Sequence, residues 1–276
     1  MSALVEALAQ IVGARHVLTG EAAQPYLVDW LGKYRGAAAA VVRPGSTQEV
    51  ARVVAACAAA RAPIVPQGGA TSLSGGATPD CSGRAVVLSL RRLNRIREID
   101  CVGDTMTVDA GVVLAAAQEA ARGAGRFFPM SLGAEGSCTI GGNLAANAGG
   151  VAVLRYGVMR ELTLGLEVVL PDGRIWDGLR ALRKDNSGYD LRDLFIGSEG
   201  TLGVVTAAVL RLFPQPRARA TAFVALPGLE AALELLQIVR GACADRVTAF
   251  EFLTRETMAL ILRHTPGLRA PFADIP

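Results

Sequence analysis

The sequence predicts an α+β fold whose main domain consists of two subdomains. Short β-branched runs alternate with segments that have the apolar spacing of amphipathic helices. Two pairs of these runs are joined by Gly103-Asp104 and Asp172-Gly173, dipeptides typical of hairpin turns. The chain has 276 residues and is 51% hydrophobic, which is enough for a domain-sized core. We therefore expect a globular protein that contains both helices and sheets.

The first subdomain is predicted at residues 37–95, after an N-terminal helical segment at 1–36 that opens with an amphipathic helix at 2–13. Ser46 and Glu49 have the spacing of a capping box, which marks the start of a helix. The elements expected here are a strand at 37–44, a helix from Ser46 to about Arg61, a strand at 63–67, a glycine-rich loop at 68–77 and a strand at 85–90.

The second subdomain is predicted at residues 96–213. Its strands are again β-branched runs, and its first helix is closed by a glycine. The expected elements are a hairpin at 96–100 and 105–111, a helix at 112–123, a loop at 132–150, a hairpin at 164–171 and 174–178, a helix at 189–197 and a strand at 203–213.

A domain boundary is expected near Gln215, because Pro214 and Pro216 cannot continue a central strand. The main domain then covers 37–214, and a further domain begins at 215–276. In this further domain we expect a strand at 221–226, a helix at 229–242, a strand at 247–253 and a helix at 254–264. Such a βαβα fragment lacks the strands that would complete a sheet, so the chain is expected to be incomplete at its C-terminus and to expose apolar surface that favours self-association.

Three glycine-rich segments carry the strongest functional signal: 66–72, 133–150 and 196–203. Closely spaced backbone N–H groups with little side-chain bulk form concave sites that suit a diphosphate. A single glycine-rich loop is more often only a tight turn. Three such segments in one domain, each containing Ser, Thr or Asn, favour a ligand. The first is followed by a strand, and no G-x-G-x-x-G or G-x-x-x-x-G-K-[ST] motif occurs, so Rossmann and P-loop sites are disfavoured.

Composition excludes several classes of partner and site. The net charge is only +3 and basic residues are not clustered, so nucleic acid is not expected as a partner. The five cysteines are widely spaced, which indicates neither a metal site nor a disulfide framework and favours a reducing compartment. The N-terminus lacks the features of a signal peptide, and no apolar run has membrane-spanning length. We predict a cytoplasmic protein and leave open a peripheral association with the inner membrane.

Four segments together resemble the signatures of the vanillyl-alcohol-oxidase family of FAD-linked oxidoreductases, which have a PCMH-type FAD-binding domain. They are PQGGATSLSGG (66–76), SLGAEGSCTIGGNLAANAGG (131–150), LEVVLPDGRIW (166–176) and KDNSGYDLRDLFIGSEGTLGVVTAAVLRL (184–212). The resemblance extends from about Val41 to Phe213. It is greatest to the branch that contains D-lactate dehydrogenases, D-2-hydroxyglutarate dehydrogenases and the flavoprotein subunit of glycolate oxidase.

This resemblance implies that FAD lies between the two subdomains and that a partial ferredoxin-like cap domain follows. The implied cofactor-binding residues are Pro66, Gly68, Gly69, Ala70, Thr71, Ser72, Gly133, Ala134, Ser137, Thr139, Gly142, Asn147, Gly149, Glu199, Gly200, Val204 and Val205. The third segment lies near the ribityl and ring portion of the flavin in relatives. Some relatives bind flavin covalently through a histidine in the first loop. Ala70, Thr71 and Ser72 stand in that loop here, so non-covalent FAD is expected.

The resemblance also implies oxidation of a D-2-hydroxy acid such as D-lactate, D-2-hydroxyglutarate or glycolate, by hydride transfer to flavin N5. The electrons would pass to a quinone, a cytochrome or an electron-transfer flavoprotein. Relatives carry their base histidine and metal ligands in the C-terminal half, so the catalytic residues stay unassigned and no metal site is expected in this chain. Arg255 is a candidate for binding the substrate carboxylate, although a surface role is the simpler interpretation.

Two side chains near the glycine-rich segments have simpler interpretations. Cys138 is expected to be a small packing residue, and Lys184 is as compatible with a solvated surface as with an active-site loop. One alternative to an enzyme stays open, a flavin-binding subunit without catalysis of its own. Such a subunit would need a partner chain for activity. A partner subunit or a homo-oligomer is accordingly left open as an assembly.

Overall fold

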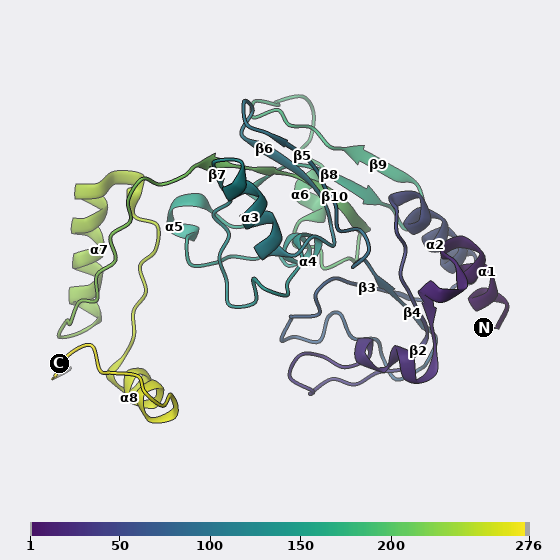
Figure 1. Ribbon diagram of the computed structural model, residues 1–276, viewed down its shortest axis with the longest axis horizontal. Coiled ribbons are helices and arrows are strands. Elements are labelled where there is room, and N and C mark those ends of the chain that lie inside the picture. Colours follow the sequence, from purple (N-terminus) through teal and green to yellow (C-terminus); the bar gives the residue numbers. More distant parts are fainter. Residues whose placement is uncertain (1, 274–276) are drawn as a thin grey trace. The chain divides into compact units, whose positions relative to one another are not determined.

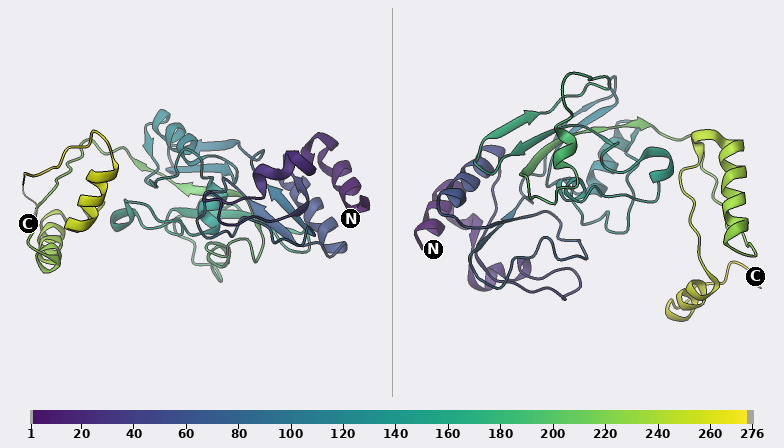
Figure 2. Two further views of the ribbon diagram at one scale, coloured as in Figure 1. Left: turned by 90° about the horizontal axis from the view of Figure 1, so that it is seen from below. Right: turned by 180° about the vertical axis from the view of Figure 1, so that it is seen from behind.

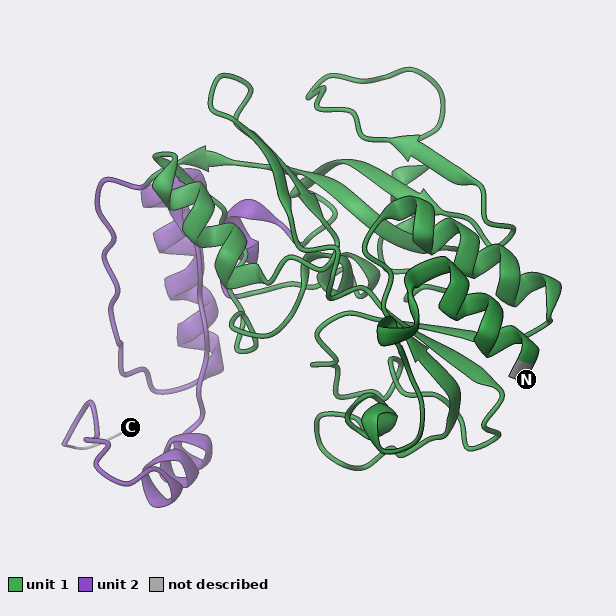
Figure 3. Ribbon diagram, turned by 45° about the vertical axis from the view of Figure 1, so that its right-hand side comes forward, with its two compact units in different colours: residues 1–150, 158–215 green, residues 151–157, 216–276 purple. Residues whose placement is uncertain are grey.

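The computed structural model describes residues 2–273, so residue 1 of the predicted N-terminal segment and residues 274–276 of the predicted cap lie outside the described residues. The chain divides into two compact units (Figure 3). The first comprises residues 1–150 and 158–215, and the second comprises 151–157 and 216–276. We keep the division at 1–36, 37–214 and 215–276 as a proposal. Its boundary between 214 and 215 lies one residue from the end of the first unit at Gln215.

The first unit contains a four-stranded sheet in the order β1-β2-β4-β3. Its strands are β1 (Val17–Leu18), β2 (Ala38–Val42), β3 (Ile64–Gln67) and β4 (Ala85–Ser89). The strands β2, β4 and β3 run parallel, and β1 pairs antiparallel with β2. Every residue of β4 is buried, as expected for the central strand of a parallel sheet. The strands predicted at 37–44, 63–67 and 85–90 are thus all present.

Two helices lie side by side next to this sheet, α1 (Ser2–Val12) and α2 (Thr47–Ala59) (Figures 1 and 2). The Ser46 hydroxyl accepts a hydrogen bond from the Glu49 N–H, which confirms the predicted N-cap of α2. Val50, Val53 and Cys57 form the buried face of this helix. The 3-10 helices η1 (Ala14–His16) and η2 (Gly20–Tyr26) connect α1, β1 and β2.

The second sheet is antiparallel and five-stranded, in the order β5-β6-β10-β8-β9. Its strands are β5 (Ile96–Asp100), β6 (Thr105–Asp109), β8 (Thr163–Val169), β9 (Ile175–Gly178) and β10 (Val204–Arg211). Both predicted hairpins are formed, since β5 pairs with β6 and β8 pairs with β9. The α+β class is therefore confirmed, and the two sheets correspond to the two predicted subdomains.

Several short elements lie between the strands of the second sheet along the chain. The helix α3 (Leu114–Gly123) was predicted, and β7 (Arg126–Phe127) pairs with β11 (Phe213–Pro214). The helix α4 (Ile140–Ala145) lies against β10 and β6 (Figure 1). The helix predicted at 189–197 is limited to α6 (Arg192–Phe195), and α5 (Val153–Tyr156) belongs to the second unit. The sequence pattern indicated neither α4 nor α5, because six or four residues are too few to show a helical period.

The second unit contains α7 (Leu229–Cys243), η3 (Ala244–Arg246) and α8 (Arg255–His264). The predicted strands at 221–226 and 247–253 are wrong, because neither segment pairs with another backbone among residues 216–273. Strand propensity takes effect only when a neighbouring strand supplies hydrogen bonds. The buried hydrophobic residues described in this unit are Ala232 and Met258, whereas Phe223, Leu233 and Ile238 are exposed. Across the described residues, none of the helices is both long enough and apolar enough to span a bilayer.

Candidate functional site

The first and second glycine-rich segments pack directly against each other. A Cβ atom added to Gly69 would lie 2.2 Å from the carbonyl oxygen of Ser137. One added to Gly68 would lie 2.3 Å from Oγ1 of Thr139. Both distances are far shorter than a van der Waals contact, so only glycine allows the two segments to approach so closely.

The third segment is attached to the second and lies beside the first. The backbone N–H groups of Gly197 and Glu199 donate to the last carbonyls of α4, both at 2.9 Å. A Cβ atom added to Gly200 would lie 3.1 Å from Cγ of Pro66, the residue that begins the first segment. The fold therefore brings together three segments that are far apart in the sequence.

Each of these segments contains one non-glycine residue with a left-handed backbone. The φ angles are 55° at Ala70, 45° at Asn147 and 52° at Glu199. This conformation is uncommon for residues with a Cβ atom, and it persists where the surrounding structure fixes the backbone, often at binding sites. Strain in all three segments therefore supports a shared binding role.

The first segment presents a row of backbone donors without protein acceptors. Within residues 2–273, the N–H groups of Gly68 to Ser72 make no hydrogen bond to another protein atom. Unpaired N–H groups in a loop of small residues form a concave site that favours anionic oxygens. The residues present therefore fit a diphosphate at this loop.

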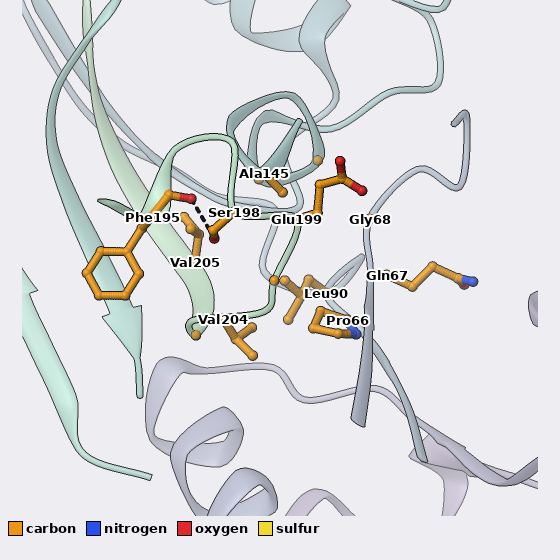
Figure 4. A pocket seen from close by; sticks show the side chains of 14 residues that line it. Pro66, Gln67, Gly68, Leu90, Ala145, Phe195, Ser198, Glu199, Val204 and Val205 are labelled. Carbon is orange, nitrogen blue, oxygen red and sulfur yellow. Dashed lines mark hydrogen bonds between the residues drawn. The ribbon is translucent and has the colours of Figure 1, made fainter. Parts of the chain in front are cut away.

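A hollow of about 50 Å³ lies where the segments meet (Figure 4). The Glu199 side chain and Gly68 lie on one side of it, and Phe195 lies on the other. The Ser198 hydroxyl donates to the Phe195 carbonyl at 2.8 Å, which fixes the turn between them. The lining residues are Pro66, Gln67, Gly68, Leu90, Gly141, Gly142, Ala145, Phe195, Ser198, Glu199, Gly200, Gly203, Val204 and Val205.

A second hollow of about 200 Å³ shares Pro66, Gly200, Gly203 and Val204 with the first. Its remaining lining comes from α2, from the chain at and just before the start of β3, from the end of β8 and the two residues after it, and from Thr201 of the third segment. These residues are Val54, Ala58, Ala62, Ile64, Val169, Leu170, Pro171 and Thr201. Apart from the Thr201 hydroxyl the side chains are apolar, so this hollow suits an uncharged, largely apolar group.

The structure brings part of the predicted cofactor set to the first hollow. The predicted residues that line it are Pro66, Gly68, Gly142, Glu199, Gly200, Val204 and Val205. Ser137 and Thr139 lie against the first segment without lining the hollow. The other predicted residues, which also do not line it, are Gly69, Ala70, Thr71, Ser72, Gly133, Ala134, Asn147 and Gly149. The whole set stays a prediction of cofactor contacts.

Several lining residues had no distinguishing signal in the sequence. Leu90 and Phe195 are ordinary apolar residues that follow a strand and close a short helix. Gln67 is buried, and its side-chain amide donates to the carbonyls of Tyr26 and Ala77. Only the folded arrangement identifies Leu90 and Phe195 as part of the site, whereas Gln67 already lies in the first glycine-rich segment, 66–72.

The candidate residues outside the glycine-rich segments can also be placed. Cys138 is buried, and burial raises the pKa of its thiol, which agrees with a packing role. Arg255 is the first residue of α8 in the second unit, and its assignment to a substrate carboxylate stays a prediction. Lys184 is exposed. Among residues 2–273, no three His, Cys, Asp or Glu side chains are grouped as a metal site would require.

Comparison with known proteins gives consistent results. D-2-hydroxyglutarate dehydrogenase, mitochondrial, from Bos taurus is 42% identical over 270 residues, which covers 98% of this chain and 49% of the relative. D-2-hydroxyglutarate dehydrogenase from Xanthomonas citri pv. viticola is 43% identical over 247 residues, which covers 90% of this chain and 51% of the relative. The chain thus spans about half the length of these relatives.

A solved structure of alkyldihydroxyacetonephosphate synthase has the same fold as most of this chain. The TM-score is 0.71 at 23% sequence identity, and the match covers 79% of this chain and 41% of the synthase. At this level of identity the likeness concerns the fold alone.

The predicted cytoplasmic location is contradicted by these comparisons, because the relatives from Bos taurus, Rattus norvegicus and Oryza sativa subsp. indica are named as mitochondrial proteins. The five cysteines are free thiols in this structure. Free thiols indicate a reducing environment, but they do not distinguish the cytoplasm from the interior of an organelle. The spacing of the cysteines therefore does not identify the compartment.

The family described as "FAD binding domain" matches residues 38–178, just over half of the chain. The matched region contains both sheets in part, the whole first glycine-rich segment and the whole second one. Its unpaired N–H groups and its closely packed glycines fit the diphosphate of such a cofactor. The chain belongs to the family of PCMH-type FAD-binding domains.

Proposed function

We propose that this chain is the FAD-binding part of a dehydrogenase that oxidises D-2-hydroxy acids, with D-2-hydroxyglutarate as the preferred substrate. The observation that carries the proposal is the 42% identity to a D-2-hydroxyglutarate dehydrogenase, which extends over 98% of the chain. The similarity therefore continues beyond residues 38–178, into the unit that contains α7 and α8.

Bound FAD supplies the hydride acceptor for such a reaction. We assign the diphosphate to the backbone N–H groups of Gly68 to Ser72, which have no protein acceptor among the described residues. The apolar second hollow would take a ring of the cofactor. Glu199 lines the first hollow, and a carboxylate accepts hydrogen bonds from hydroxyl groups but repels phosphate. It therefore suits a ribose or ribityl hydroxyl.

Non-covalent binding of FAD follows from the chemistry of the first loop. Ala70, Thr71 and Ser72 offer no imidazole, and the only histidines of the chain are His16 and His264. We expect acid precipitation of the holoprotein to release all of the flavin into the supernatant, which absorbance of the two fractions would measure. Flavin that stays in the washed pellet would contradict non-covalent binding.

The substrate proposal predicts reduction of bound flavin by one enantiomer. In the absence of oxygen, we expect D-2-hydroxyglutarate to bleach the visible flavin band, with less effect from D-lactate or glycolate and none from L-2-hydroxyglutarate. The rate of bleaching reports how well a base is positioned to take the hydroxyl proton of the substrate. Stopped-flow absorbance would measure the rate.

The results of this experiment test the substrate proposal and the cofactor site separately. A flavin spectrum that no hydroxy acid bleaches would contradict hydroxy-acid oxidation by this chain but leave FAD binding in place. A chain that binds no flavin after reconstitution would contradict the cofactor site itself. We also propose that the electron acceptor is a quinone, a cytochrome or an electron-transfer flavoprotein. Mixing each of these with the reduced protein and following reoxidation of the flavin would identify it.

A further inference from the structure

Arg160 lies outside both hollows and connects the second glycine-rich segment to the third. Its backbone N–H donates to Oδ1 of Asn147 at 3.0 Å. Its guanidinium donates to the carbonyl of Asp193 at 2.6 Å and to the carbonyl of Ile196 at 2.7 Å. One residue therefore contacts the left-handed Asn147 on one side and the start of the third segment on the other.

The carbonyls that Arg160 binds flank residues that line the first hollow. Phe195 stands between Asp193 and Ile196, and Ser198 and Glu199 follow directly. A Cβ atom added to Gly197 would lie 3.3 Å from Asn147 Cβ and 3.6 Å from an Arg160 amino nitrogen, so this turn is packed between the two side chains. Movement of the guanidinium would therefore move the wall of the hollow.

The backbone on either side of Arg160 is also held in place by hydrogen bonds. The neighbouring Met159 N–H donates to the Ala148 carbonyl at 3.0 Å, and the Met159 carbonyl accepts from the Thr163 hydroxyl at 2.7 Å. Residues 158–163 are thus fixed to the second segment at one end and to β8 at the other. The planar guanidinium, with its fixed set of donors, can bind two carbonyls at once, which a lysine cannot do in the same geometry.

We infer that Arg160 is a positioning residue for the cofactor: it holds the third segment against the second, so that the hollow has the shape that binds FAD. The inference rests on the proposed cofactor site and assigns to it a residue that does not touch the hollow. Its contribution should therefore appear in the affinity for FAD more than in the stability of the protein without cofactor.

Arg126 provides a matched control elsewhere in the same unit. Its guanidinium also binds a backbone carbonyl, that of Cys101 at 2.6 Å, and also pairs with an aspartate, Asp104. Its side chain is 28% exposed, compared with 33% for Arg160. Arg126 lies in β7 and lines neither hollow. Its loss should lower stability by a similar amount and leave FAD binding unchanged.

The test compares Arg160→Ala, Arg160→Lys and Arg126→Ala with the wild type. Quenching of FAD fluorescence gives the Kd, and thermal unfolding of the apoprotein gives the Tm. We expect Arg160→Ala to raise the Kd at least about tenfold, the effect of losing one or two hydrogen bonds from a charged donor. Arg160→Lys should fall between wild type and Arg160→Ala, and methylguanidine should restore FAD binding to Arg160→Ala.

Each outcome has a defined meaning. Equal Kd values for wild type and Arg160→Ala, or an equal rise in Arg126→Ala, would overturn the positioning role. A rise that methylguanidine does not reverse would also count against it, because a general loss of structure has no site for that ion. A wild-type chain that binds no FAD would overturn the cofactor site as well, so the two failures are distinguishable.

Discussion

Replacement of Gly69 by alanine is expected to raise the Kd for FAD by more than about 100-fold, the effect of losing two hydrogen bonds from backbone N–H groups to charged oxygens. The added Cβ atom would lie 2.2 Å from the Ser137 oxygen and 2.9 Å from the Cys138 Cα. Both are backbone atoms, so no side-chain rotation relieves the clash. The first loop must move away from the second segment, and its N–H groups lose their arrangement.

Titration of FAD into the apoprotein measures this effect, and two glycines elsewhere provide controls. Gly165→Ala would place a Cβ atom 2.5 Å from the Arg180 nitrogen, a similar backbone clash in β8 away from both hollows. Gly123→Ala meets no atom within 4 Å. We expect Gly165→Ala to lose stability but keep its FAD affinity, and Gly123→Ala to keep both. Normal FAD binding by Gly69→Ala would contradict the assignment of the diphosphate to the first loop.

The sequence was sufficient to predict the strands of the two sheets and the approximate location of the candidate site. Strands such as β4 and β10 are almost continuous runs of apolar residues rich in valine, and their burial on both faces is the physical cause of that pattern. The three glycine-rich segments were visible because a close backbone contact leaves no room for a side chain at Gly69 and a positive φ of 78° favours glycine at position 200. Where the backbone geometry permits only glycine, the presence of glycine in the sequence indicates that geometry.

Other parts of the site could not be predicted from the sequence, because their role depends on which segments meet. Arg160 acts through carbonyls more than thirty residues further along the chain, and any residue type supplies such carbonyls. The second hollow is lined by residues such as Val54 and Leu170, which elsewhere would be ordinary packing residues. The strands expected in the second unit failed for the same reason, since a strand depends on a neighbour that its own sequence does not specify.

Glu167 joins the start of α2 to the second sheet through a buried charge, and its replacement by glutamine is expected to lower the free energy of unfolding by about 2 kcal/mol. One carboxylate oxygen accepts from Thr47 at 2.6 Å, from Arg97 at 2.9 Å and from Thr206 at 2.9 Å. Thr47 begins α2 beside the first sheet, whereas Arg97 and Thr206 belong to the second. The Glu167 side chain is only 13% exposed, so its ion pair is poorly screened by solvent.

Chemical denaturation would measure the loss, with Glu119→Gln as the matched control. Glu119 also pairs with an arginine, Arg122, but its side chain is 69% exposed. Surface pairs of this kind contribute less than about 1 kcal/mol, so we expect little change in Glu119→Gln. An equal loss in the two variants would show that removal of any carboxylate, and not the buried position of Glu167, causes the effect.

The pH dependence of the same variant tests whether charge is the cause. Burial alone would raise the pKa of Glu167, but the hydrogen bonds from Arg97, Thr47 and Thr206 outweigh it and hold the pKa below its ordinary value. A lowered pKa in the folded state means that the carboxylate stabilises the fold fully above its unfolded pKa and loses this effect as the pH falls through the folded value. The stability difference between wild type and Glu167→Gln should therefore be largest near neutral pH and shrink on acidification. A difference that stays constant into the acid range would show that the amide disturbs packing instead, and the link between α2 and the second sheet would then be steric.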